Sequence, residues 1–293
     1  MENSDIQDPL FRETVEAIDS GNISLLRQLL DENPALATIR LNTPNEEGYF
    51  KNPYLLWFVA DNPIRHEKIP SNIVEVTQII LEALQNNPGD NYQHQVDYAL
   101  GLVCTGRIPK ECGVQIPLME LLISNGARVK GSVLGPIGQR NFEAAKFLLS
   151  KGADYNLATA VGLDQIDDVK KLLKNATASE LYVALVVASF FGKADIISLL
   201  VEAGVEVNGL GERKDFGGFH AHASALHQAV YSGSLESVKL LVEAGANLNA
   251  TDKAYNGTPL GWAMYMQTEE GYSEEDRKRF SVVEDFLKSH TTH

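Results

Sequence analysis

Two twelve-residue stretches of the chain repeat each other: residues 197–208 read ISLLVEAGVEVN, and residues 238–249 read VKLLVEAGANLN. In both stretches apolar residues recur at spacings of three and four, which places them on one side of a helix. Gly204 and Gly245 then stand where the end of a helix favours a residue that tolerates positive φ. The repeat therefore predicts helices with one buried stripe, each ended by a glycine.

Weaker copies of the same pattern occur at residues 119–127, MELLISNGA, and 145–154, AKFLLSKGAD. A short apolar segment precedes each copy, and small-residue turns separate the two segments, as at residues 191–193 and 232–234. This order describes a helical hairpin. Because one hairpin cannot bury its apolar face alone, it must stack on its neighbours in an array.

The segments that open two of these hairpins identify a family. Residues 224–229 read SALHQA, and residues 257–263 read GTPLGWA. They resemble the Thr-Pro-Leu-His-x-Ala opening of the ankyrin repeat, here in a degenerate array of the bacterial type. The resemblance is strongest over residues 190–265. It implies an all-α solenoid whose first helices line a groove, and it implies that the ring of His227 bonds neighbouring backbone.

The repeat lengths are irregular. Leucine markers in the central part of the chain are 24–27 residues apart, and elsewhere 41–51 residues apart, against about 33 in the family. We therefore expect about eight stacked hairpins in a single domain, 1–293, with short β-turn fingers at most. The expected parts are an N-terminal capping repeat (1–45), two long degenerate repeats (46–131), two short repeats (132–179), two well-formed repeats with an inserted finger at 209–223 (180–252), and a C-terminal capping repeat (253–293).

Charge and composition exclude several classes of function. The 293 residues include 25 Lys+Arg and 39 Asp+Glu, a net charge of −14, which argues against binding to nucleic acid or anionic membranes. The chain begins without the basic and apolar regions of a signal peptide, and its longest strongly apolar stretch, residues 181–191, is too short to span a membrane. These features predict a soluble cytoplasmic protein.

The sequence shows no pattern of catalysis. Cys104 and Cys112 lie in a segment with Gly and Pro, and nothing near them in sequence identifies a base. We expect no enzyme activity and no cofactor. A resident metal is not expected either.

The inserted finger contains two closely spaced histidines, His220 and His222. On an extended strand a His-x-His pair points both rings to one face, as a transition-metal site requires. The alternatives are contact with a partner or ligand, since loops on rigid scaffolds often bind, and a finger with a purely structural role. The residues expected to bind a partner, from the finger and from the first helices of the last two repeats, are Phe216, Phe219, His220, His222, Tyr231, Trp262 and Tyr265.

The favoured function is a protein–protein interaction scaffold, expected to be monomeric, that binds a partner protein through its groove and finger. Two alternatives stay open. One is a metal- or small-ligand-responsive protein centred on His220 and His222. The other is an acidic immunity or regulatory factor for a basic partner, to which an acidic run at residues 269–276 would contribute.

Overall fold

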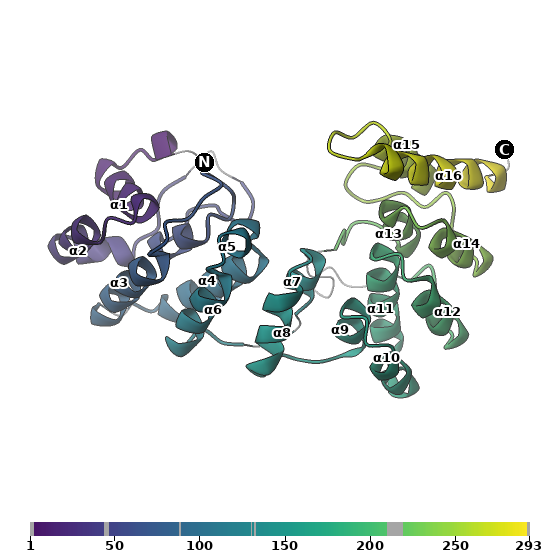
Figure 1. Cartoon of the computed structure of the whole chain (residues 1–293), viewed down its shortest axis with the longest axis horizontal. Helices are drawn as coiled ribbons and strands as arrows, with labels where there is room; N and C mark the ends of the chain where they lie inside the picture. The colour runs from purple at the N-terminus through teal and green to yellow at the C-terminus, as the bar shows by residue number, and fades with distance from the viewer. Residues whose placement is uncertain are drawn as a thin grey trace. The chain divides into compact units, whose positions relative to one another are not determined.

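The computed structural model describes residues 3–43, 47–87, 89–129, 131, 133–209 and 219–291. It divides into two compact units (Figure 1). Unit 1 comprises Met1–Lys130 and Gln139–Ala153, and unit 2 comprises Gly131–Gly138 and Asp154–His293. Within the described ranges the regular structure is helical, with no strand and one isolated bridge between Arg40 and Tyr54. This confirms the all-α fold class.

Unit 1 is built from seven α-helices and three short 3₁₀-helices within its described residues. The α-helices are α1 (Pro9–Ser20), α2 (Ile23–Glu32), α3 (Ile73–Asn86), α4 (Tyr92–Thr105), α5 (Arg107–Glu111), α6 (Gln115–Ser124) and α8 (Phe142–Ser150), and the 3₁₀-helices are η1 (Asn3–Asp5), η2 (Pro34–Ala37) and η3 (Leu55–Ala60). Helix α1 packs on α2, η3 on α3, and α4 on α6. The aromatic residues Trp57 and Phe58 on η3 are buried, as expected of core side chains.

Unit 2 has the more regular repeats. Its described helices are α7 (Leu134–Gly138), α9 (Leu157–Gly162), α10 (Ile166–Leu172), η4 (Leu173–Asn175), α11 (Ala178–Phe190), α12 (Ala194–Glu202), α13 (Ala225–Ser232), α14 (Leu235–Glu243), α15 (Pro259–Met266) and α16 (Glu274–His290). Each odd-numbered helix from α9 to α15 pairs with the helix that follows it.

The helices of unit 2 form two layers. Helices α9, α11, α13 and α15 pack side by side in order, and α10, α12, α14 and α16 do the same (Figure 1). Helix α11 lies between α9 and α13, and for this reason all residues from Leu181 to Phe190 are buried. The layers explain why an almost entirely apolar helix is stable here: it has neighbours on three sides.

The local signals at the ends of helices are those that the sequence indicates. Gly204 and Gly245 adopt φ values of 83° and 89° after α12 and α14, and Gly126 and Gly152 adopt positive φ as well. At the start of α15, the side chain of Thr258 accepts a hydrogen bond from the backbone N–H of Gly261, and Pro259 follows it. The helix ends that the sequence pattern predicts are therefore confirmed at these positions.

The arrangement of the helices does not test the predicted division of the chain into repeats of a single domain. The expected hairpin within residues 132–150 is divided, because α7 belongs to unit 2 and α8 to unit 1. One continuous array over residues 1–293 stays a prediction. In the finger, residues 210–218 lie outside the described part of the chain.

A buried arginine connects the first helix of unit 1 to the segment after η3. The side chain of Arg65 is 2% exposed, and its Nη2 lies 2.6 Å from Oδ1 of Asp19 on α1. Its Nε lies 3.8 Å from Oδ1 of Asp61, and the guanidinium lies over the ring of Phe58, 4.9 Å from its centroid. Removal of this cation would leave two largely covered carboxylates without their partner.

We predict that Arg65→Ala lowers the free energy of unfolding by about 3 kcal/mol, because uncompensated buried charge is costly. Urea denaturation followed by circular dichroism measures the change. Arg27→Ala is the control, since Arg27 pairs with Glu82 at 3.3 Å while about half exposed, and such pairs contribute less than about 1 kcal/mol. Equal effects of the two substitutions would contradict this role of Arg65.

Candidate functional site

The loop between α14 and α15 is organised by one buried carboxylate, that of Asp252. Its Oδ1 accepts hydrogen bonds from the backbone N–H groups of Ala254 (2.9 Å) and Tyr255 (2.7 Å), and its Oδ2 accepts one from Gly257 (2.9 Å). Burial raises the pKa of Asp252, but the hydrogen bonds outweigh it and hold the pKa below its usual range. The side chain is therefore an anion that fixes the turn.

The same carboxylate orients two aromatic side chains. Trp262 on α15 donates from Nε1 to Oδ2 of Asp252 at 3.0 Å, and Nδ1 of His222 lies 3.1 Å from Oδ1. The backbone of Lys253 also donates to the carbonyl of His222 at 2.8 Å. The loop after α14 and the segment before α13 are consequently held together around Asp252.

His227 and Gly261 occupy the same position in two successive repeat openings. His227 is fully buried: its Nδ1 is 3.3 Å from the backbone nitrogen of Ser224, and its Nε2 is 3.0 Å from the carbonyl oxygen of Gly257. This confirms that its ring bonds neighbouring backbone. Gly261 has no side chain, and a Cβ built there would meet only Oγ1 of Thr258, at 3.4 Å. The space that a ring would fill beside α15 is left open.

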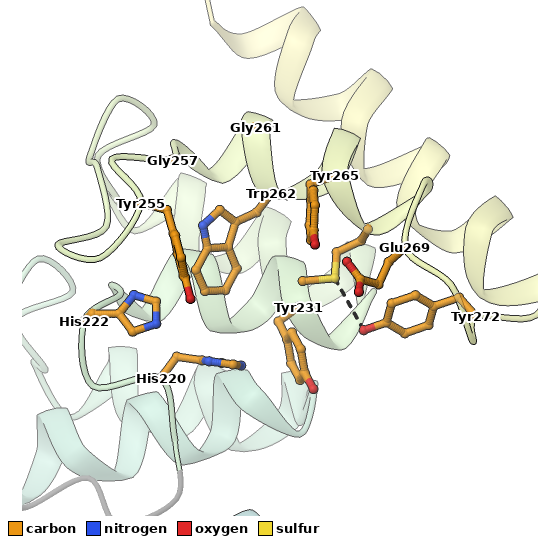
Figure 2. Close-up of a pocket in the computed structure, with 11 residues that line it drawn as sticks. His220, His222, Tyr231, Tyr255, Gly257, Gly261, Trp262, Tyr265, Glu269 and Tyr272 are labelled. Carbon is orange, nitrogen blue, oxygen red and sulfur yellow. Dashed lines mark hydrogen bonds between the residues drawn. The ribbon is translucent and has the colours of Figure 1, made fainter. Parts of the chain in front are cut away.

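A pocket of about 680 Å³ lies at this position. Its walls come from the segment before α13, from α13 itself, from the loop before α15, from α15 and from the loop after it (Figure 2). The lining residues are His220, His222, Tyr231, Tyr255, Gly257, Gly261, Trp262, Tyr265, Met266, Glu269 and Tyr272.

The rings of the pocket pack against one another at their inner edges. The ring of His220 lies edge-on to those of Tyr231 (centroids 4.6 Å apart) and Trp262 (5.4 Å). Tyr231 is in turn stacked on Phe190 of α11 at 5.2 Å. Burial, followed by the nearby His222, lowers the pKa of His220, so this imidazole is neutral at pH 7. These contacts make the inner wall a fixed aromatic surface.

The outer end of the pocket is polar and acidic. The nearby carboxylate of Glu269 raises the pKa of the Tyr265 hydroxyl. Tyr272 donates from its hydroxyl to Sδ of Met266 at 3.4 Å. Arg277 on α16 donates to the backbone carbonyl of Glu269 at 2.8 Å and to those of Gln267 and Tyr272. The loop that presents Glu269 is therefore anchored to α16.

Comparison with known proteins agrees with this repeat geometry. A family model described as ankyrin repeats, in three copies, matches residues 157–252. Residues 157–252 are ankyrin repeats. The match extends from the start of α9 to Asp252, within unit 2. No curated protein matches the chain.

Ankyrin repeats generally act in protein–protein interaction and are generally non-enzymatic. Within the described residues, no helix combines the length and the apolar character needed to cross a membrane.

The structure brings five of the seven residues proposed from the ankyrin resemblance and the finger into one pocket. These are His220, His222, Tyr231, Trp262 and Tyr265. Trp262 is 9% exposed and Tyr265 is 59% exposed, so the first is held in the wall and the second stands at the surface. Phe219 is buried against Phe190 at 4.9 Å and is not among the lining residues, and Phe216 lies outside the described residues.

Sequence reasoning did not select Tyr255, Met266 and Tyr272 as contact residues, and it indicated Glu269 only as part of the acidic run at residues 269–276. Met266 follows Trp262 by four residues on the same helix, a spacing that could have placed it on the same side. Tyr255 gave no such signal, because its position depends on the turn around Asp252. It is 81% exposed and forms the outer rim.

The metal hypothesis finds little support around the two finger histidines. Their ring centroids are 5.7 Å apart, and Nδ1 of His222 already faces Asp252. Over the described parts of the chain, no group of three or more His, Cys, Asp or Glu side chains is arranged to hold a metal ion. Of the two cysteines, Cys104 is buried, and burial raises its pKa to about 12, which leaves this thiol unreactive.

We predict that Asp252→Asn lowers the free energy of unfolding by about 2 kcal/mol at pH 7, because the amide N–H₂ would face backbone and indole donors. Since the pKa of Asp252 is lowered by folding, its charge stabilises the fold above the unfolded pKa of about 3.9, and this stabilisation is lost as the pH falls. The difference in stability between wild type and variant should therefore begin to narrow as the pH falls below about 4. Thermal unfolding between pH 3 and pH 7 measures the difference.

Asp154→Asn is the control for this pH dependence, since Asp154 is an exposed carboxylate of unit 2. It should change the stability by less than about 0.5 kcal/mol at either pH. A difference between wild type and Asp252→Asn that stays constant from pH 7 to pH 3 would contradict the role assigned to the Asp252 anion.

Proposed function

We propose that this protein is a non-enzymatic interaction scaffold that binds a partner protein through the first helices of unit 2 and the finger at residues 209–223. The pocket around Trp262 is the anchor for that partner. The observation that supports the proposal is the convergence of five expected contact residues on one open, aromatic pocket. Large aromatic side chains at the centre of a patch contribute most of the energy of many protein interfaces.

The pocket has the properties of an anchor site. Its rings are held by Asp252, by Phe190 and by the loop bonded to Arg277, so little ordering is required when a partner binds. Tyr265 and Tyr255 extend from the rim into solvent and present large surfaces for contact. A side chain of the partner can enter the space beside Gly261.

The volume of the pocket supports a second candidate function. About 680 Å³ lies within the range of sites that hold small organic ligands. A small-ligand-responsive protein would use the same walls but would need no contact with Tyr255 or with the finger. The partner-binding function is preferred because Tyr255 and Tyr265 line the pocket and are also largely exposed, so they extend its aromatic surface into solvent. The expectation of a cytoplasmic monomer stays a prediction.

We predict that Gly261→Leu and Tyr265→Ala each reduce capture of the partner from a native cell extract by more than about tenfold. Leucine at position 261 fills the pocket, and it also favours the helix over glycine by about 0.8–1 kcal/mol. Affinity capture with quantitative mass spectrometry measures the loss. Thermal unfolding of both variants should stay close to wild type.

Gly101→Leu is the matched control. Gly101 lies on α4 of unit 1 with no atom within 4 Å of a built Cβ, so the same change there leaves the pocket intact. Deletion of residues 210–218 tests the finger in the same experiment. A partner retained in full by Gly261→Leu, or lost equally with Gly101→Leu, would contradict binding at this pocket.

A further inference from the structure

We propose that the pocket of unit 2 receives an arginine side chain of the partner protein, with the guanidinium against the Trp262 and tyrosine rings and beside the carboxylate of Glu269. This inference rests on the proposed function and deepens it. It names the chemistry of the anchor rather than the partner.

The rings form a surface suited to a cation. Aromatic faces carry a negative quadrupole, and Trp is the strongest of them in attracting a guanidinium or ammonium group. The attraction of a cation to the Trp262 ring is strengthened further, because its Nε1–H donates to the Asp252 carboxylate at 3.0 Å. Such a hydrogen bond shifts electron density into the indole. Tyr255, Tyr265 and Tyr231 are placed around the same space (Figure 2).

In unit 1, an arginine of the same chain lies over neighbouring Tyr and Trp rings. There the guanidinium of Arg40 lies 4.6 Å from the centroid of Tyr54 and 5.6 Å from that of Trp57. In unit 2, a Tyr–Trp set lines the pocket, and no described lysine or arginine lies over these rings. The described part of the pocket is thus a cation-binding aromatic surface that this chain's own described cations leave uncovered.

The polar groups of the pocket are acceptors or neutral groups. Glu269 supplies a carboxylate, the tyrosines supply hydroxyl oxygens, and none of the lining residues that the structure describes is a lysine or an arginine. His220 is neutral at pH 7 because burial lowers its pKa, and His222 faces the balancing Asp252 carboxylate. Arg277 is the basic residue bonded to the loop, and it donates to three backbone carbonyls. A guanidinium, which has five N–H donors and no acceptor, complements this set.

Arginine fits these walls better than lysine or an apolar side chain does. The guanidinium is planar, stacks on aromatic faces and is more weakly hydrated than an ammonium, so less hydration is lost on entry. An apolar side chain would cover the carboxylate of Glu269 without any compensating bond, which is unfavourable. Glu269 is partly buried, whereas its neighbour Glu270 is exposed and does not line the pocket.

The test is a titration of the full chain with the peptide acetyl-Gly-Gly-Arg-Gly-Gly-amide. The control peptide carries citrulline, a neutral isostere, in place of arginine. Indole N–H signals in ¹H–¹⁵N spectra report binding, because the chain has two tryptophans, Trp262 in the pocket and Trp57 in unit 1. We expect the arginine peptide to shift the Trp262 signal, with an affinity about tenfold above that of the citrulline peptide, and to leave Trp57 unchanged.

Variants locate the effect. Gly261→Leu should abolish the shift, and Gly101→Leu should retain it. Glu269→Gln should weaken the arginine peptide about three- to tenfold, whereas Glu270→Gln, which changes the net charge equally, should leave its affinity within about twofold. Equal affinities for arginine and citrulline, or equal effects of the two glutamate substitutions, would overturn the inference. Tighter binding of free L-arginine than of the peptide would make the ligand a small molecule and would overturn it too.

This experiment separates the inference from the proposed function. If Gly261→Leu loses the captured partner but the arginine peptide does not shift the Trp262 signal, the pocket binds a partner through other chemistry and the arginine assignment is wrong. If capture is unaffected by Gly261→Leu, the proposed function itself fails at this site.

Discussion

The buried Asp252 carboxylate is the constraint on which the candidate site of unit 2 depends. An anion removed from water must be met by several donors, and here three backbone N–H groups and the indole of Trp262 supply them. The backbone donors close the turn, and the indole donor fixes the orientation of Trp262 on α15. A single requirement for hydrogen bonds therefore sets both the shape of a loop and the direction of the largest ring in the pocket.

A second constraint is the space that remains beside Gly261, at the position that His227 occupies in the preceding repeat. His227 and Gly261 stand at the same place in adjacent openings, and both helices begin with a hydroxyl side chain that caps the first turn. The ring of His227 fills its place and bonds the backbone of the next loop. At Gly261 the same frame presents a space instead. Repeats of one architecture can thus differ in surface while they keep the same packing of helices.

The sequence predicted much of the fold, because its signals are local. Spacings of three and four give the buried stripe of each helix, and glycines such as Gly204 mark the ends with positive φ. Two features were harder to predict from the sequence: the contacts of Arg65 and the division into two units. Residues 61–66, where Arg65 meets Asp19 and Asp61, gave no periodic signal, since the contact between Arg65 and Asp19 joins residues 46 positions apart. The division of the described chain into two units also depends on contacts that no local pattern encodes.

By itself the sequence determined the helical hairpins and the ankyrin openings, and it indicated Tyr231 and Trp262 as contact residues, because periodicity and capping act over a few residues. Tertiary structure alone decided that His220 and Tyr255, thirty-five residues apart, line one pocket with Glu269. It also decided that Phe219 is buried instead. The physical reason is that the turn around Asp252 and the stacking of α13 on α15 bring distant segments together, and such contacts are made only when the whole unit packs.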